Sequence, residues 1–136
     1  MNDDALFEIV KAINKNFYDR VYADPWLAKM FEIVPQEVIE SQQTDFMVGA
    51  LGGPVRYRGR SPKDAHPHLY VTEEIWQRRE EHLLATFEEL KVGESIAQKW
   101  LKIDNAFKQS IVKNSIDECQ KRFFTDEIVS LRKKAA

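Results

Sequence analysis

Apolar residues recur every three or four positions through nearly the whole of this chain, and this spacing constrains its fold more than any other feature. Only five glycines and five prolines interrupt the spacing among 136 residues, and they fall at the edges of the periodic stretches. An amphipathic helix repeats every 3.6 residues, whereas a half-buried strand alternates with a period of two. The sequence therefore predicts an all-α protein.

Capping residues predict where the helices begin and end. Asp24 before Pro25 is typical of a capped helix start, and it opens a short helix that reaches Phe31. Thr72, followed by two glutamates, opens a long helix in the same way. Further helices are expected to begin near Asp3 or Asp4 and at Pro35, and Gly93 is expected to separate the last two main helices.

The length predicts one domain over residues 1–136, because a chain of this size can bury about two thirds of its unfolded surface around one core. After the last main helix, residues 113–136 are expected to form a C-terminal helical extension. Its apolar residues include Phe123, Phe124, Ile128 and Leu131.

Composition excludes several classes of function. A net charge of −2 gives no reason to expect nucleic acid as a partner. Cys119 is the single cysteine and permits no internal disulfide. No apolar run of about 20 residues is present, which argues against a membrane span. We therefore expect a cytoplasmic protein.

The segment from Gly52 to His66 carries most of the information about function. It opens with Gly-Gly-Pro, which ends the preceding helix because glycine adopts the left-handed conformation and proline cannot continue a helix. A capped helix start follows at Ser61-Pro62, but Pro67 soon interrupts it. His66 therefore lies on a short or irregular helical segment.

The order of landmarks along the chain is distinctive. These landmarks are Phe17-Tyr18, Phe31, Gln42-Gln43, Gly52-Gly53-Pro54, Tyr57-x-Gly59 and Ala65-His66. This order resembles the truncated hemoglobins, small haem proteins that bind oxygen and other diatomic gases. The resemblance covers about residues 17–107 and is closest to group I. Group II stays open, with Trp76 as its characteristic tryptophan in a shifted register.

The resemblance implies a shortened globin fold, a two-over-two helical sandwich around haem b. His66 would be the proximal ligand of the haem iron, since it follows Ala65 and the Tyr-x-Gly stretch as the family's ligand does. A lone histidine is otherwise more often an exposed or structural residue. A non-haem metal site at His66 and His68 is disfavoured, because residues two apart do not share a helix face. His82 is expected at the surface or in helix packing.

Two polar side chains are candidates to stabilise bound oxygen. Ile39 stands where many globins carry a distal histidine, and Tyr18 and Gln43 can replace that histidine as hydrogen-bond donors. Without the family resemblance, Tyr18 would be interpreted as a packing residue and Gln43 as a solvated one.

The resemblance also implies the walls and the mouth of a haem pocket. Tyr57 and Lys63 are expected near the haem propionates, although the loop from Arg56 to Arg60 is equally compatible with solvated arginines. The other expected cofactor contacts are Phe31, Ile39, Gln42, Phe46, Met47, Leu69, Trp76, Arg79 and Phe107.

Arg79 departs from the family pattern. It lies one turn beyond Trp76, where truncated hemoglobins usually carry an apolar residue or a tryptophan. Either Arg79 enters the site as an extra cation, or the helix register shifts by one residue. The first helix also lacks the early Gly-Gly pair of many family members, so the chain can begin as one continuous helix.

Three functions follow as expectations. The first is reversible binding of dioxygen, with nitric oxide and carbon monoxide as further ligands, coupled to nitric-oxide dioxygenation with an external reductase. The second is a peroxidase-like or gas-sensing haem protein, for which a distal cation such as Arg79 would matter. The third is a haem-free helical module that binds a protein partner. A strong Soret band in the purified protein would exclude the third.

Overall fold

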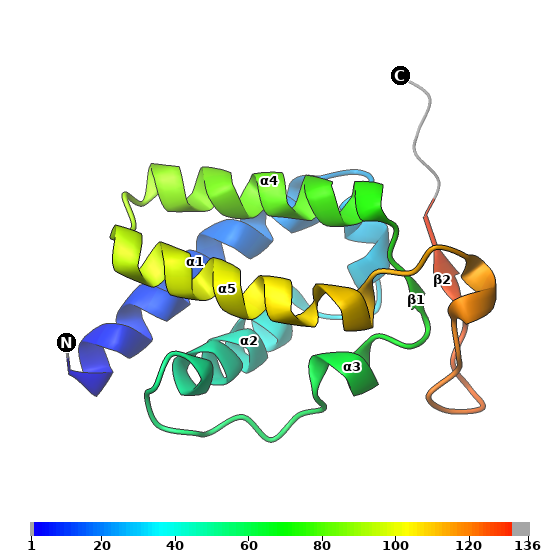
Figure 1. Ribbon diagram of the computed structural model, residues 1–136, viewed down its shortest axis with the longest axis horizontal. Coiled ribbons are helices and arrows are strands. Elements are labelled where there is room, and N and C mark those ends of the chain that lie inside the picture. The colour runs from blue at the N-terminus through cyan, green and yellow to red at the C-terminus, as the bar shows by residue number, and fades with distance from the viewer. Residues whose placement is uncertain (1, 132–136) are drawn as a thin grey trace.

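The computed structural model describes residues 2–131, apart from the side chains of Pro62 and Lys63, and these residues are mainly helical (Figure 1). The predicted all-α class is confirmed. The long helices are α1 (Asp3–Ala23), α2 (Gln36–Ala50), α4 (Glu73–Glu89) and α5 (Glu94–Ile111). The short elements are η1 (Leu27–Phe31), α3 (Pro62–Ala65), β1 (Leu69–Tyr70), η2 (Ile116–Glu118) and β2 (Val129–Ser130).

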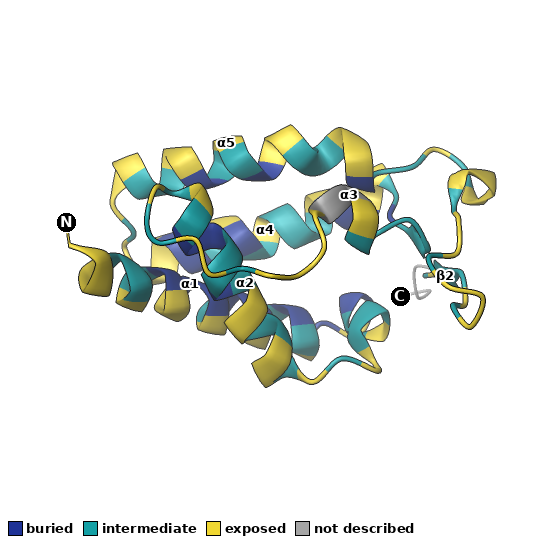
Figure 2. Ribbon diagram, turned by 90° about the horizontal axis from the view of Figure 1, so that it is seen from below, coloured by how far each residue is buried: buried dark blue, intermediate teal, exposed yellow. Residues whose placement is uncertain are grey.

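The long helices form the two-over-two sandwich that the family resemblance implies. Helix α1 packs against α2 and α4, while α4 and α5 run side by side as a hairpin (Figure 1). The buried faces of the helices turn toward one another (Figure 2). Val10 and Leu83 lie at the centre of the core and are fully buried. No helix among residues 2–131 is long and apolar enough to cross a membrane.

Local capping explains the starts of α4 and η1, and both agree with the sequence predictions. The side chain of Thr72 accepts a hydrogen bond from the backbone N–H of Ile75 at the start of α4. Asp24 ends α1, and its side chain accepts from the N–H groups of Trp26 and Leu27 at the start of η1. These bonds satisfy donors that a helix N-terminus otherwise leaves unpaired.

Two glycines end α2 for different reasons. Gly52 has φ +97°, a conformation that L side chains rarely adopt. At Gly53 the constraint is space instead, because a Cβ atom there would lie 2.8 Å from Val48 Cγ1 and 3.0 Å from Leu6 Cδ2. The sequence could not distinguish these two roles.

The predicted helical extension is wrong for residues 113–131. This stretch contains only the η2 turn and strand β2, which pairs in parallel with β1 so that Val129 lies opposite Leu69. Its aromatic residues do not form a buried stripe, since Phe124 is 93% exposed and Phe123 50% exposed. Residues 132–136 of the predicted extension lie outside the described residues.

Candidate functional site

A largely apolar cavity lies inside the helical sandwich and collects most of the residues singled out from the sequence. The predicted residues that line it are Tyr18, Phe31, Ile39, Gln43, Phe46, Met47, Tyr57, His66, Leu69, Trp76, Arg79 and Phe107. Gln42 is an incorrect prediction: it is exposed and does not line the cavity, because it is rotated about 100° from Gln43 around α2. The side chain of Lys63 lies outside the described part of the chain.

His66 reaches the cavity from the end of the one-turn helix α3. Ser61 caps this helix, Pro62 occupies its first turn, and His66 is its C-terminal cap with φ −113°. His66, Ala65 and Leu69 line one wall of the cavity, whereas His68 is not among the lining residues. His68 instead lies in the field of Arg122 and Asp126, and burial is the main cause that lowers its pKa. Only one histidine of this pair therefore reaches the cavity.

Tyr18 and Gln43 reach the cavity from α1 and α2. Ile39, Gln43 and Met47 follow one another at intervals of four residues and so share one face of α2. Tyr18 is 7% exposed and packs edge-on against Phe17 and Phe31. Burial raises the pKa of the Tyr18 phenol above its usual range, so the group keeps its proton. Within residues 2–131, no hydrogen bond is found for its hydroxyl or for the Gln43 amide.

Arg79 enters the cavity as a cation, which settles the question raised by the sequence. Its guanidinium donates two hydrogen bonds to Asp104 on α5, from Nη1 to Oδ2 at 2.6 Å and from Nη2 to Oδ1 at 2.7 Å. The group also lies over the rings of Trp76 and Phe17, at 4.7 and 5.3 Å from their centroids. Burial opposes the charge, but Asp104 outweighs burial and the pKa of Arg79 is raised. A compensated ion pair thus forms part of the cavity wall.

The loop between α2 and α3 supplies one basic residue to the cavity. All three arginines of this loop are exposed, and of the three only Arg60 lines the cavity, while Arg56 and Arg58 do not. The hydroxyl of Tyr57 donates to the carbonyl of Arg60 at 2.6 Å, so its ring lines the cavity while its donor is already used. Among the described residues of this loop, Arg60 is therefore the cation that lies where it can meet an anionic group at the cavity.

Several lining residues could not be recognised from the sequence. They include Asn14, Ile75, Trp100, Ile103, Asp104 and Ile111. Asn14 donates to Thr44 Oγ1 at 3.1 Å and so ties α1 to α2 beside Gln43. The sequence did not indicate Asp104, because an acidic residue in an amphipathic helix normally lies on the solvent face. Its place at the cavity follows only from its contact with Arg79.

Comparison with known families agrees with this architecture. The model of the bacterial-like globin family matches residues 6–113. The chain belongs to this family. Among curated proteins, this globin is 31% identical over 94 residues to a group 1 truncated hemoglobin of Tetrahymena pyriformis, an alignment that covers 69% of the chain and 78% of that protein. A group 1 truncated hemoglobin of Chlamydomonas moewusii is 34% identical over 62% of this chain and 51% of its own length.

Solved structures of truncated hemoglobins share the fold. The Fe(III) form of the Tetrahymena pyriformis protein superposes with a TM-score of 0.68 and 28% identity, over 79% of this globin and 92% of that chain. The 2/2 hemoglobin of Synechococcus sp. PCC 7002, in the cyanomet state with covalently attached heme, gives a TM-score of 0.60 and 26% identity, over 82% of this chain and 87% of that chain. The group I resemblance expected from the Gly-Gly-Pro and Ala-His spacing is confirmed by the curated relatives, which are group 1 truncated hemoglobins.

The cofactor of this globin is haem b, as expected, and the cavity fits it. A bare metal ion needs several protein ligands, and residues 2–131 contain no group of three or more His, Cys, Asp or Glu side chains that could hold one. A haem needs one imidazole and an apolar slot for its ring, which His66 and the rings of Phe46 and Phe107 can provide. The buried Nε1 of Trp76 is a further donor there without a partner in the described residues.

Proposed function

We propose that this globin binds dioxygen reversibly, with His66 as the proximal iron ligand and Tyr18 and Gln43 as donors to the bound gas. One observation carries the proposal: His66, the protonated phenol of Tyr18 and the amide of Gln43 all line one otherwise largely apolar cavity. Bound haem would supply an iron centre with a coordination position open to a diatomic gas.

The chain's own residues would select the gas. The phenol O–H of Tyr18 and the amide N–H of Gln43 favour a ligand that carries partial negative charge, as dioxygen does on ferrous haem, over nearly apolar carbon monoxide. A hydrogen bond to a charged acceptor contributes about 1.5–3 kcal/mol, equivalent to about tenfold or more in affinity. The apolar walls limit the entry of water, which would otherwise compete for these donors.

The same cavity suits nitric-oxide dioxygenation, in which dioxygen and nitric oxide combine to form nitrate and one electron restores the ferrous state. Residues 2–131 form the helical sandwich alone. The proposal includes a separate reductase as the source of this electron.

Substitution of His66 tests the proposal. His66→Ala should abolish stable haem incorporation, while His68→Ala and His82→Ala should retain it, because only His66 lines the cavity. The ratio of Soret to protein absorbance measures this directly. His66→Gly supplemented with free imidazole should regain the Soret band. Normal haem retention in His66→Ala would contradict the assignment of the ligand.

A second function is favoured by the Arg79–Asp104 pair. Of the five N–H donors of the Arg79 guanidinium, two bond Asp104, so others remain for a polar ligand. Such a cation suits the reduction of hydrogen peroxide to two water molecules by two electrons and two protons, the electrons coming from an external donor.

Removal of both charges tests this second function. Arg79→Leu combined with Asp104→Leu avoids leaving one charge buried alone. Peroxide turnover and the affinity of the ferric protein for azide should each fall about tenfold or more, which corresponds to about 1.4 kcal/mol for one charged hydrogen bond. Unchanged values for both would exclude a role of Arg79 in ligand recognition.

A further inference from the structure

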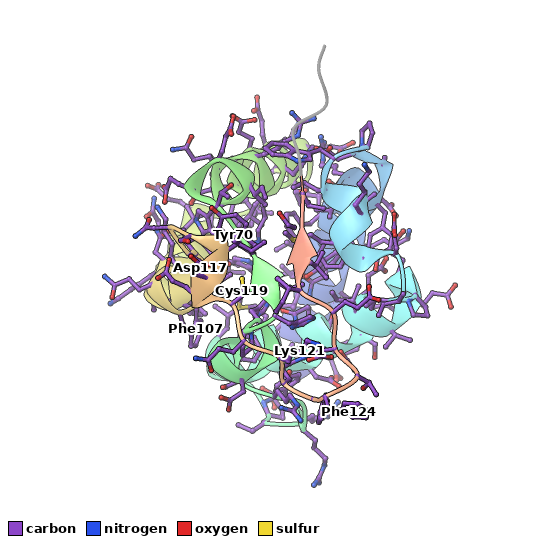
Figure 3. All side chains as sticks on the ribbon, turned by 90° about the vertical axis from the view of Figure 1, so that its right-hand side faces the viewer. Tyr70, Phe107, Asp117, Cys119, Lys121 and Phe124 are labelled. Atoms are coloured by element: carbon purple, nitrogen blue, oxygen red, sulfur yellow. The ribbon has the colours of Figure 1, made fainter. Side chains whose placement is uncertain are left out.

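The chain that follows α5 lies against the segment that carries His66. We name residues 113–131 the C-terminal segment; only its first residue falls within the family match. Figure 1 shows it running beside β1 at the end of the molecule near α3. Figure 3 looks at this end and shows the loop with Cys119, Lys121 and Phe124 in front of the helices.

The C-terminal segment donates hydrogen bonds to every carbonyl from Ala65 to Leu69. The ammonium of Lys113 donates to the carbonyls of His66 at 3.0 Å and Leu69 at 2.7 Å. The other donors are the N–H of Gln120 to Pro67 at 2.8 Å, the N–H of Val129 to His68 at 2.9 Å, and Nη1 of Arg122 to Ala65 at 3.4 Å. The backbone N–H of Lys113 also donates to the carbonyl of Val71 at 2.9 Å.

These contacts matter because α3 provides little support of its own. Helix α3 is four residues long, and an isolated turn of helix is unstable without tertiary contacts. His66 lines the cavity with its side chain while its carbonyl is held by Lys113 from the C-terminal segment. The placement of the imidazole is therefore coupled to the position of residues 113–129.

The C-terminal segment has internal bonds that hold its shape. Ser115 and Glu118 form a capping box at η2, with both reciprocal bonds present. Asp126 accepts from the backbone N–H and the guanidinium of Arg122, at 2.8 and 3.0 Å, and closes the loop that follows. A loop fixed in this way can hold its neighbour, whereas a flexible loop could not.

We propose that the C-terminal segment is a proximal clamp, in which the Lys113 ammonium and the Gln120 N–H are positioning groups that hold His66 toward the haem. The proposal rests on the proposed role of His66 as the iron ligand. The clamp sets the strength of the bond between His66 and iron, and it slows the loss of haem.

Two matched pairs of variants test the clamp in the full-length haem protein. Lys113→Met keeps the aliphatic stem and deletes the donor, and Lys121→Met removes the same charge from an exposed position of the same segment. Gln120→Pro deletes the backbone donor, and the preceding Cys119, with φ −74° and ψ 142°, already has the conformation that proline demands of its neighbour. Gln120→Ala keeps this donor and serves as its control.

Resonance Raman spectra of the ferrous proteins and rates of haem transfer to apomyoglobin give the readouts. Lys113→Met and Gln120→Pro should shift the iron–histidine stretching band and speed haem loss about fivefold to tenfold, while the controls should match the wild type. Circular dichroism must show wild-type helix content in each variant. If the band is present but unshifted in Lys113→Met and Gln120→Pro, and the rate of haem loss is unchanged, the clamp is overturned. If the wild-type protein shows no iron–histidine band, the ligation of iron by His66 is overturned instead.

Discussion

At the scale of single residues, Tyr18 is the side chain on which the choice of ligand should depend most. Tyr18→Phe deletes one hydroxyl of a residue that lines the cavity, and it leaves the ring contacts with Phe17 and Phe31 in place. Loss of about 1.5–3 kcal/mol should speed oxygen dissociation about 10- to 150-fold, with much less effect on carbon monoxide. Stopped-flow dissociation rates for both gases measure this.

Gln43 provides the companion measurement. Gln43→Leu should also speed oxygen dissociation, but by a smaller factor than Tyr18→Phe. In the double variant the factor should be smaller than the product of the two single-variant factors, because two donors that share one acceptor are coupled. Equal changes for oxygen and carbon monoxide would show that Tyr18 only packs, and Arg79 would then be the next donor to test.

The family resemblance, and not helix periodicity alone, predicted the polar residues of the cavity. Tyr18 and Gln43 both line it, although the residues by themselves favoured packing for Tyr18 and solvent for Gln43. Arg79 left two interpretations open, since its burial depends on Asp104, which lies 25 residues away on another helix. Gln42 was misplaced because adjacent residues on a helix point in different directions.

At the scale of elements, the end of α2 shows how a close approach fixes a glycine. Gly53→Ser should lower the free energy of unfolding by about 1–3 kcal/mol, because its Cβ would press on Val48 and Leu6. Gly93→Ser is the matched control: nothing lies within 4 Å of a Cβ there, and serine is a good N-cap for α5. Urea unfolding curves compare the two variants, and equal midpoints would rule out the steric role of Gly53.

Element prediction succeeded where the signals were local. The caps at Asp24, Ser61 and Thr72 lie within three residues of the groups they satisfy, so the sequence alone predicts them. The C-terminal segment failed as a predicted helix because its structure depends on distant partners, such as the pairing of Val129 with Leu69. Its helical spacing of apolar residues was therefore misleading.

At the scale of the whole molecule, the carboxylate of Asp24 joins the end of α1 to α4. Its side chain is 1% exposed and accepts hydrogen bonds from Arg78 at 2.5 Å and His82 at 2.8 Å. Burial alone would raise the pKa of Asp24, but these hydrogen bonds outweigh burial and hold the pKa well below its usual range. The folded protein therefore binds this proton less readily than the unfolded chain does.

This lowered pKa predicts how stability depends on pH. A group whose pKa is depressed in the folded state stabilises it above the unfolded pKa, about 3.9 for aspartate, and that stability is lost as pH falls further. Asp24→Asn should lower the free energy of unfolding at pH 7 by about 1.5–3 kcal/mol, the range for hydrogen bonds to a charged group. Between about pH 4 and pH 2 this variant should lose less stability than the wild type. Urea midpoints across this range measure both effects, with exposed Asp117→Asn as control. Parallel curves for wild type and Asp24→Asn would mean that other carboxylates cause the acid sensitivity, and that the link between α1 and α4 does not depend on the charge of Asp24.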